Sequence, residues 1–142
     1  MGARRDGRVL AFQSLYRHEM TGQSLPEILD CSWMEEKARG DLSEESRAFA
    51  ALLVQGTLER LTDVDEHIRR QLDNWHMERL SRVDLAILRV SVYALLYQPT
   101  IPVNVTIDEA VDIAKEYGGD KSYRFVNGVL DGVKKASNQA ET

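Results

Sequence analysis

The sequence predicts an all-α protein of six or seven helices. Apolar residues recur at three- and four-residue spacing along most of the chain, which is the pattern of helices with one buried face. Serine caps, glycines and prolines separate these stretches. The stretch from Ser81 to Gln98 is apolar on nearly every side, so we expect a central helix that the others bury.

Two helices are expected before the central part of the chain. The first spans residues 4–20 and has an apolar face. Ser24 caps a second, weaker helix, because Pro26 suits a first turn and Glu27 completes a capping box. Residues 37–42 are predicted to form a loop.

Two more helices lead to the central one. Ser43 caps a strong helix, whose predicted buried stripe is Phe49, Leu52, Leu53, Gly56 and Leu58. Thr62 or Asp63 is expected to cap the next, which has its apolar residues at Val64, Ile68, Leu72 and Trp75. Residues 74–80 then link it to the central helix.

The central helix has clear end signals. The Ser81 side chain is expected to accept a hydrogen bond from the Asp84 backbone, and the Asp84 carboxylate to reach back in a variant capping box. Pro99 ends the helix.

The last part of the chain is predicted to hold two helices. Residues 100–105 should be extended, because they contain Pro102 and several β-branched residues. A capping box at residues 106–109 starts a helix that ends at Gly118-Gly119. The last helix covers about residues 122–136, and residues 137–142 form a polar tail that we expect to fray.

Composition is typical of a soluble protein, with 43% hydrophobic and 29% charged residues among 142. The single cysteine, Cys31, and the lack of an opening signal segment lead us to expect a cytoplasmic protein without a membrane anchor. The net charge of −5 argues against a general polyanion binder. However, residues 1–20 carry four basic and only two acidic side chains, so the basic excess lies at the N-terminus.

No pattern of catalysis or metal binding stands out. His18, His67 and His76 lack ligand spacing, and Cys31 has no convincing base beside it in the sequence. Phosphate-binding loops, dinucleotide fingerprints and HExxH runs do not occur. We therefore expect no enzymatic activity, no cofactor and no metal.

Two stretches are candidate RNA-binding surfaces. Arg4, Arg5 and Arg8 fall within a sector of roughly 100° on the first helix. Their planar donors suit phosphate oxygens and stacking on bases, and Tyr16 lies two turns further along. The alternative is that these are solvated arginines at a frayed terminus.

The second stretch, residues 120–128, places polar and basic groups at a helix start, where free N–H groups also favour an anion. Phe125 offers a base-stacking ring, with burial as an equal alternative, and Asn127 has a polar edge that suits either a base or a neighbouring loop. The candidate RNA-binding residues here are Lys121, Ser122, Arg124, Phe125 and Asn127.

Three stretches match a known family. They are VLAFQSLY after the arginine-bearing start, RVDLAILRVSVYALL, and IPVNVTIDEAVDIAKEYGGDKSYRFVNGVLDGV. The chain resembles the NusB family of bacterial transcription antitermination factors over essentially its whole length. The resemblance implies two packed helical subdomains, of about residues 1–78 and 79–136, and a role without catalysis.

The resemblance also implies partners and sites. Family members pair with the small-subunit ribosomal protein known as NusE, bind single-stranded boxA RNA, and join the RNA polymerase antitermination complex, notably on ribosomal RNA operons. The implied RNA-binding residues are the two sets given above, and the implied partner-binding residue is Asp84. The sequence departs from many relatives at Asp6 and Gly7, which interrupt the arginines, and Lys121 stands where some relatives carry an acid.

Two other functions remain open from the sequence. A related helical domain precedes the catalytic domain of certain RNA cytosine methyltransferases, which implies an accessory RNA-binding module. Gly128 and Gly132 lie four residues apart on the last helix, which suits a self-associating helical protein or a homodimer.

Overall fold

A computed structural model describes residues 2–72 and 76–141 of the chain. Those residues form eight α-helices and one short 3₁₀ helix, and contain no strand, so the all-α prediction is confirmed. None of the described helices is both long and apolar enough to cross a membrane. The helices are α1 (Ala3–Thr21), α2 (Leu25–Leu29), α3 (Glu36–Asp41), α4 (Glu44–Glu59), α5 (Leu61–Arg69), the 3₁₀ helix Met77–Arg79, α6 (Arg82–Tyr97), α7 (Val103–Tyr117) and α8 (Ser122–Glu141).

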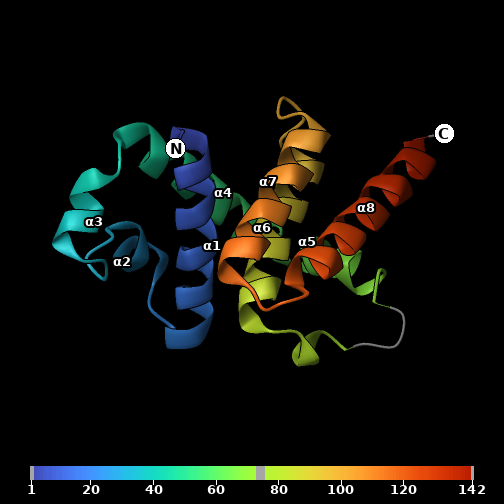
Figure 1. The fold of residues 1–142 in the computed structure, drawn as a ribbon, viewed down its shortest axis with the longest axis horizontal. Coiled ribbons are helices and arrows are strands. Elements are labelled where there is room, and N and C mark those ends of the chain that lie inside the picture. Colours follow the sequence, from blue (N-terminus) through green and yellow to red (C-terminus); the bar gives the residue numbers. More distant parts are fainter. Residues whose placement is uncertain (1, 73–75, 142) are drawn as a thin grey trace.

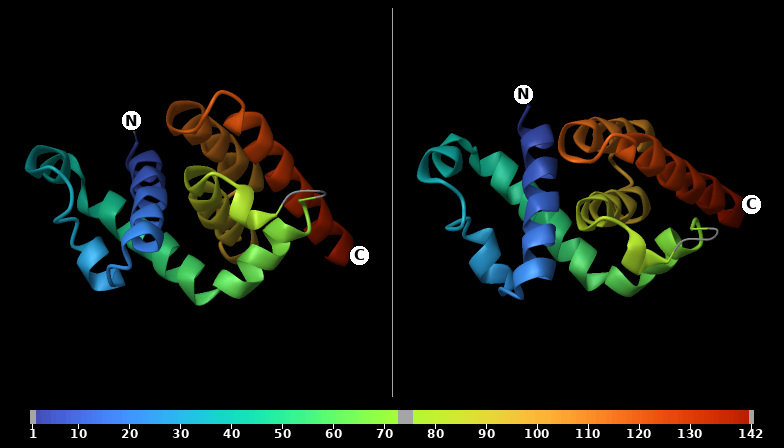
Figure 2. Two further views of the ribbon diagram at one scale, coloured as in Figure 1. Left: turned by 90° about the horizontal axis from the view of Figure 1, so that it is seen from below. Right: turned by 60° about the horizontal axis from the view of Figure 1, so that its bottom comes forward.

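The predicted central helix is α6, which packs against α1, α4, α5, α7 and α8. Figures 1 and 2 show it between α1 and α4 on one side and α7 and α8 on the other. Leu85, Ile87, Leu88 and Val92 are each at most 1% exposed. Burying such a side chain stabilises the fold by about 1.5–3 kcal/mol, which explains why the apolar surface of α6 organises the core. Because α6 contacts helices from both halves of the chain, the division near residue 78 stays a prediction.

Helices α1 and α4 pack closely at Gly7. A Cβ atom at this position would lie 2.9 Å from Cδ2 of Phe49, so a larger side chain would push the helices apart. The Ser46 hydroxyl donates to the carbonyl oxygen of Ala3 at 3.0 Å and ties the same two helices together. Gly7 therefore interrupts the arginine run because its position faces α4.

Helix α7 runs beside α1 in the same direction (Figure 1). Arg5 of α1 pairs with Glu109, and further along the ring of Phe12 lies 5.2 Å from that of Tyr117, edge to face. Gly118 ends α7, as predicted, and a short turn leads into α8.

Three predicted serine caps are confirmed. The hydroxyls of Ser24, Ser43 and Ser81 each accept a hydrogen bond from the backbone N–H three residues later. The predicted cap at Thr62 or Asp63 is wrong, because α5 begins at Leu61 without a side-chain cap.

Other expectations about local structure are also wrong. Residues 37–42 lie mostly in α3 rather than in a loop, and Leu52 is 46% exposed rather than buried. Helix α7 begins at Val103, because Pro102 has the fixed φ of a residue that precedes a helix. Thr106 is therefore inside α7 and 3% exposed instead of capping it.

The C-terminal segment is more helical than expected. Helix α8 continues to Glu141, so most of the predicted frayed tail is helix. The proposed pair of open glycines is not formed, because a Cβ at Gly132 would lie 2.7 Å from Cδ of Gln71, whereas Gly128 faces open space. Trp75 and Asn74 lie outside the described residues.

Candidate nucleic-acid interface

Arg4 is the exposed arginine at the start of α1. Its Cζ atom lies 4.4 Å from the ring centroid of Phe49, a cation–π contact that orients the guanidinium at the protein surface. The side chain keeps donors that a phosphate can approach from solvent.

Arg5 points toward α7 and is already paired. Its Nε atom donates to Glu109, and its Nη2 atom donates to Asp112 at 3.0 Å, so its side chain is only 18% exposed. The hydrogen bond to Glu109 raises the pKa of the guanidinium. The sequence analysis missed both acids, since nothing in the sequence links positions more than 100 residues apart.

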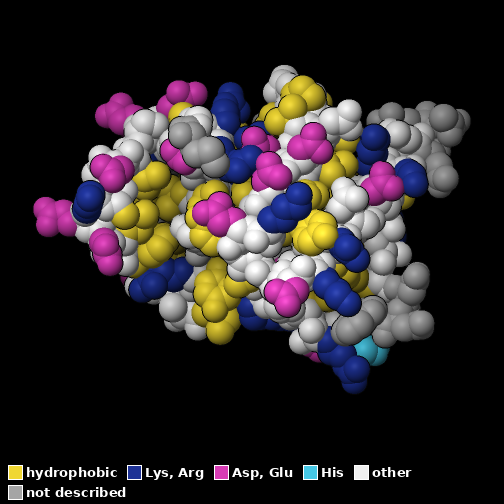
Figure 3. Space-filling model, viewed as in Figure 1, with side chains coloured by type: hydrophobic (Ala, Val, Ile, Leu, Met, Phe, Trp, Pro, Cys, Tyr) yellow, Lys and Arg dark blue, Asp and Glu magenta, His cyan; other side chains and the backbone are white. Residues whose placement is uncertain are grey.

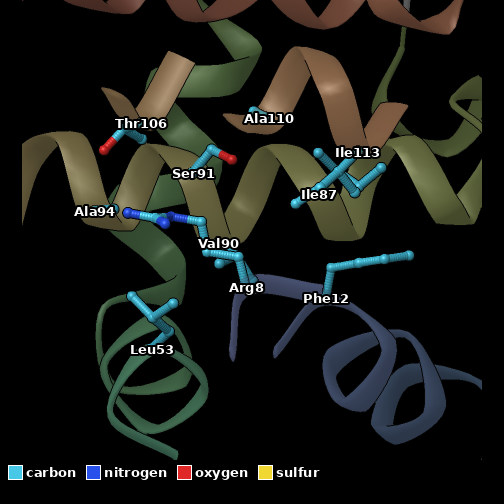
Figure 4. Close-up of a pocket in the computed structure, with 10 residues that line it drawn as sticks. All are labelled: Arg8, Phe12, Leu53, Ile87, Val90, Ser91, Ala94, Thr106, Ala110 and Ile113. Carbon is cyan, nitrogen blue, oxygen red and sulfur yellow. The ribbon is translucent and has the colours of Figure 1, made fainter. Parts of the chain in front are cut away.

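Arg8 lies half-buried in a small hollow between α1, α4, α6 and α7. Its Cζ atom lies 5.2 Å from the centroid of the Phe49 ring, and burial lowers the pKa of its guanidinium. The hollow has a volume of about 20 Å³, and Figure 4 shows the Arg8 side chain extending into it, with Leu53 on one side and Ser91 and Thr106 on the other. The predicted basic patch of three arginines is thus reduced to one exposed cation, Arg4.

Tyr16 lies further along α1 and is partly buried. It lines a groove of about 390 Å³, together with Phe12, Met20, Trp33, Val83 and Tyr117. Met20 is 55% and Tyr117 39% exposed, so the groove opens to solvent along apolar side chains. A half-exposed phenol ring in such a groove suits stacking against a flat ligand group.

The start of α8 presents two exposed cations, Lys121 and Arg124. Arg124 donates through Nε to the Tyr123 hydroxyl at 3.0 Å, which holds the guanidinium beside the ring. Asn127 is exposed as well, whereas Phe125 is partly buried and packs on the core.

Ser122 is buried and bonded within the protein. Its hydroxyl accepts from the Gly119 backbone N–H at 2.9 Å and donates to Oδ2 of Asp84 at 3.1 Å. The Ser122 hydroxyl therefore joins α8 to α6 in this structure, whereas the sequence analysis expected it to contact RNA.

Asp84 is 8% exposed, at the start of α6. Its carboxylate accepts a hydrogen bond from Ser122 and makes none to Ser81, so the predicted variant capping box is wrong. Oδ1 is buried and has no hydrogen-bond partner among the described residues. Asp84 lines a groove of about 470 Å³ with Arg79, Lys121 and Phe125, among others.

The two predicted stretches lie apart. Arg4 is in the first turn of α1, in the upper part of the view in Figure 1, whereas α8 starts lower, beside the C-terminal end of α7. A helix of 19 residues such as α1 is about 28 Å long. Figure 3 shows Lys and Arg side chains interspersed with Asp and Glu over this face, so a ligand that reaches both stretches must cross mixed charge.

In the part of the chain that the structure describes, no cluster of His, Cys, Asp and Glu side chains is arranged to hold a metal. Cys31 is 1% exposed.

The comparisons with known proteins agree with this architecture. The sequence model of the NusB family matches residues 5–135. The chain belongs to the NusB family. Among NusB relatives, the transcription antitermination protein NusB of Treponema denticola is 46% identical over 134 residues, covering 94% of this chain and 97% of its own. That of Myxococcus xanthus is 39% identical, with 98% and 99% covered.

Solved NusB structures have the same fold. NusB of T. maritima is 38% identical with a TM-score of 0.81, covering 93% of this chain and 90% of its own. A crystal structure of the antitermination factors NusB and NusE in complex with double-stranded RNA contains a chain that is 26% identical, with a TM-score of 0.83 and coverage of 96% and 98%.

Proposed function

We propose that this chain is a transcription antitermination factor that binds boxA RNA together with NusE and joins the RNA polymerase antitermination complex, notably on ribosomal RNA operons. The observation that carries the proposal is the match, over nearly the full length of both chains, to proteins named transcription antitermination protein NusB. The protein acts by binding and not by catalysis. Its place of action is the cytoplasm, where a free Cys31 needs no disulfide partner.

The solved complex of NusB and NusE with RNA supports the proposal that this protein binds both NusE and RNA, because this chain aligns with 98% of the NusB-like chain in that complex. In our proposal the RNA of this protein is single-stranded boxA, whereas the RNA in that complex is double-stranded. Unpaired bases are what aromatic side chains at a surface can stack on.

The proposed RNA contacts fall into phosphate and base contacts. Arg4, Lys121 and Arg124 are exposed cations suited to phosphate. Tyr16 and Phe125 are half-buried rings suited to bases, and Asn127 offers a polar edge to them. In this proposal Arg5, Arg8 and Ser122 contribute only after their present contacts change.

Asp84 is the proposed NusE contact. Asp84 lines an open groove and its buried Oδ1 atom has no partner among the described residues, so a basic side chain of the partner that enters the groove would complete the hydrogen bonding of this carboxylate.

The decisive experiment measures binding of a labelled boxA single strand, with a scrambled strand as control, with and without NusE at two salt concentrations. We expect weak binding alone, since the net charge is −5, and tighter, boxA-selective binding with NusE. Arg4→Ala should lower the salt slope by about 0.7, the value for one phosphate contact on a single strand. Arg69→Ala, an exposed arginine of α5, is the matched control. Equal affinity for both strands in the presence of NusE would refute the proposal.

A further inference from the structure

Arg5 differs from its two neighbouring arginines in its partners. Arg4 and Arg8 lie against the Phe49 ring, whereas Arg5 reaches across to α7 and contacts two carboxylates. It donates through Nε to Glu109 and through Nη2 to Asp112, the latter at 3.0 Å.

These two donors form one of the two edges through which an arginine binds a phosphate with paired hydrogen bonds. Nε and Nη2 form one edge of the guanidinium, which grips an oxyanion with two parallel hydrogen bonds. Glu109 and Asp112 occupy this edge from positions three apart on α7, which places them on the same helix face. With this edge filled, only Nη1 and the second N–H of Nη2 remain for a phosphate, and the two carboxylates already offset the positive charge of Arg5.

The charges around Arg5 also disfavour phosphate binding. Arg4, Arg5 and Arg8 carry three positive charges, and Asp6, Glu109 and Asp112 carry three negative ones. Asp6 follows Arg5 in α1 and lines the same groove as Arg5. The first turns of α1 are therefore neutral overall when the two α7 carboxylates that contact Arg5 are included, although the sequence of α1 alone is basic.

The ion pair can open. The Asp112 side chain is 51% exposed and that of Glu109 23%, so water and ions reach the contact. The contact to Asp112 is exposed, and exposed ion pairs contribute little to stability, so a phosphate can compete with it; the contact to Glu109 is partly buried and is the stronger of the two.

We propose that Glu109 and Asp112 form an acidic latch that holds Arg5 against α7 and withholds it from RNA in the free protein. The inference rests on the proposed RNA-binding function and adds two positioning residues to it. It predicts that RNA affinity is limited by these two acids, and that removing their charge exposes a further cation.

The test compares the parent protein with Glu109→Gln/Asp112→Asn. The probe is a labelled 12-nucleotide single strand without boxA, titrated at several salt concentrations. The double variant should bind about 3- to 10-fold more tightly at low salt, with a salt slope steeper by about 0.7 because one phosphate contact is added. Asp108→Asn/Glu116→Gln is the matched control, because it removes two negative charges from exposed positions of α7 and leaves the ion pairs of Arg5 intact.

The Arg5→Ala background identifies the residue that responds. When Arg5→Ala is already present, adding Glu109→Gln/Asp112→Asn should alter RNA affinity by less than about 2-fold, because there is no Arg5 guanidinium to release. Unchanged affinity in the double variant, or an equal gain with Arg5→Ala, would overturn the latch. If the double variant melts below the assay temperature, Asp112→Asn alone gives the same test with a smaller gain. Since the probe lacks boxA, a failure of the latch and a failure of boxA selectivity are separate results.

Discussion

Replacing Asp84 by asparagine should weaken NusE binding about 10- to 100-fold, or about 1.4–2.7 kcal/mol, and leave the fold intact. Asparagine has the same size, and its amide oxygen can still accept the hydrogen bond from Ser122 that now spans 3.1 Å. The substitution removes the charge and replaces Oδ1, which has no partner among the described residues, by an amide NH2, so it keeps the bond to Ser122 while it tests the charge contact to the partner.

The magnitudes follow from the position of the side chain. Loss of a negative charge in the first turn of α6 should lower the free energy of unfolding by about 0.3–1 kcal/mol. A partner cation about 4 Å from Oδ1 would interact by about 4 kcal/mol at an effective dielectric constant of 20, before desolvation reduces the net value. Asp84→Lys is a poorer probe, since Asp84 is only 8% exposed and a lysine would place an unpaired charge in a buried site.

The assay combines a melting curve with titration calorimetry against NusE. Ser122→Ala is the matched control, because it removes the bond to Asp84 but keeps the carboxylate, so NusE affinity should change by less than about 3-fold while the protein loses about 1 kcal/mol of stability. If Asp84→Asn binds NusE like the parent, with the same salt dependence, the residue only joins α6 to α8 and the partner assignment is wrong.

Two further predictions concern stability. Gly56→Ala should lower the free energy of unfolding, measured by urea titration, by about 1–3 kcal/mol, because its Cβ would lie 2.6 Å from Cε1 of Tyr93. Gly128 faces open space, so Gly128→Ala should raise the free energy of unfolding by about 0.5–1 kcal/mol. Equal effects of the two substitutions would contradict the packing at Gly56. The hydrogen bond to Asp63 raises the pKa of Tyr97 above its ordinary value of 10, so the stability that this bond contributes is present below pH 10 and is lost as the pH rises through the raised pKa. Tyr97→Phe should therefore reduce the decline of the urea midpoint at alkaline pH. An unchanged decline would refute the assignment.

Local signals predicted the fold well where the decisive contact is local. Ser43 and Ser81 bond to the backbone three residues away, so the sequence itself contains both partners of each cap. The start of α7 was predicted too late because Pro102 and the β-branched residues after it also suit an extended chain. The buried residues Thr106 and Ile107 follow in the same helix, and the local sequence does not show that the helix begins before them, at Val103.

The candidate site could be predicted only in part. Composition and spacing identified the arginines and the start of α8, but whether an arginine is free depends on its neighbours in space. Arg5 pairs with residues more than 100 positions away, and Arg8 enters a hollow that four helices create. Asp84 was named through family resemblance, and only the structure shows that one of its oxygens already serves Ser122.

The central position of α6 has a consequence for synthesis on the ribosome. Helices α1, α4 and α5 are complete before α6 exists, so side chains such as Leu53 and Ile68, each at most 1% exposed in the finished protein, at first lack the helix that covers them. At about 5–20 residues per second, the interval from Arg69 to Tyr97 lasts roughly one to six seconds. During that time these side chains lack their final cover, and transiently exposed apolar surface of this kind makes a nascent chain prone to aggregation.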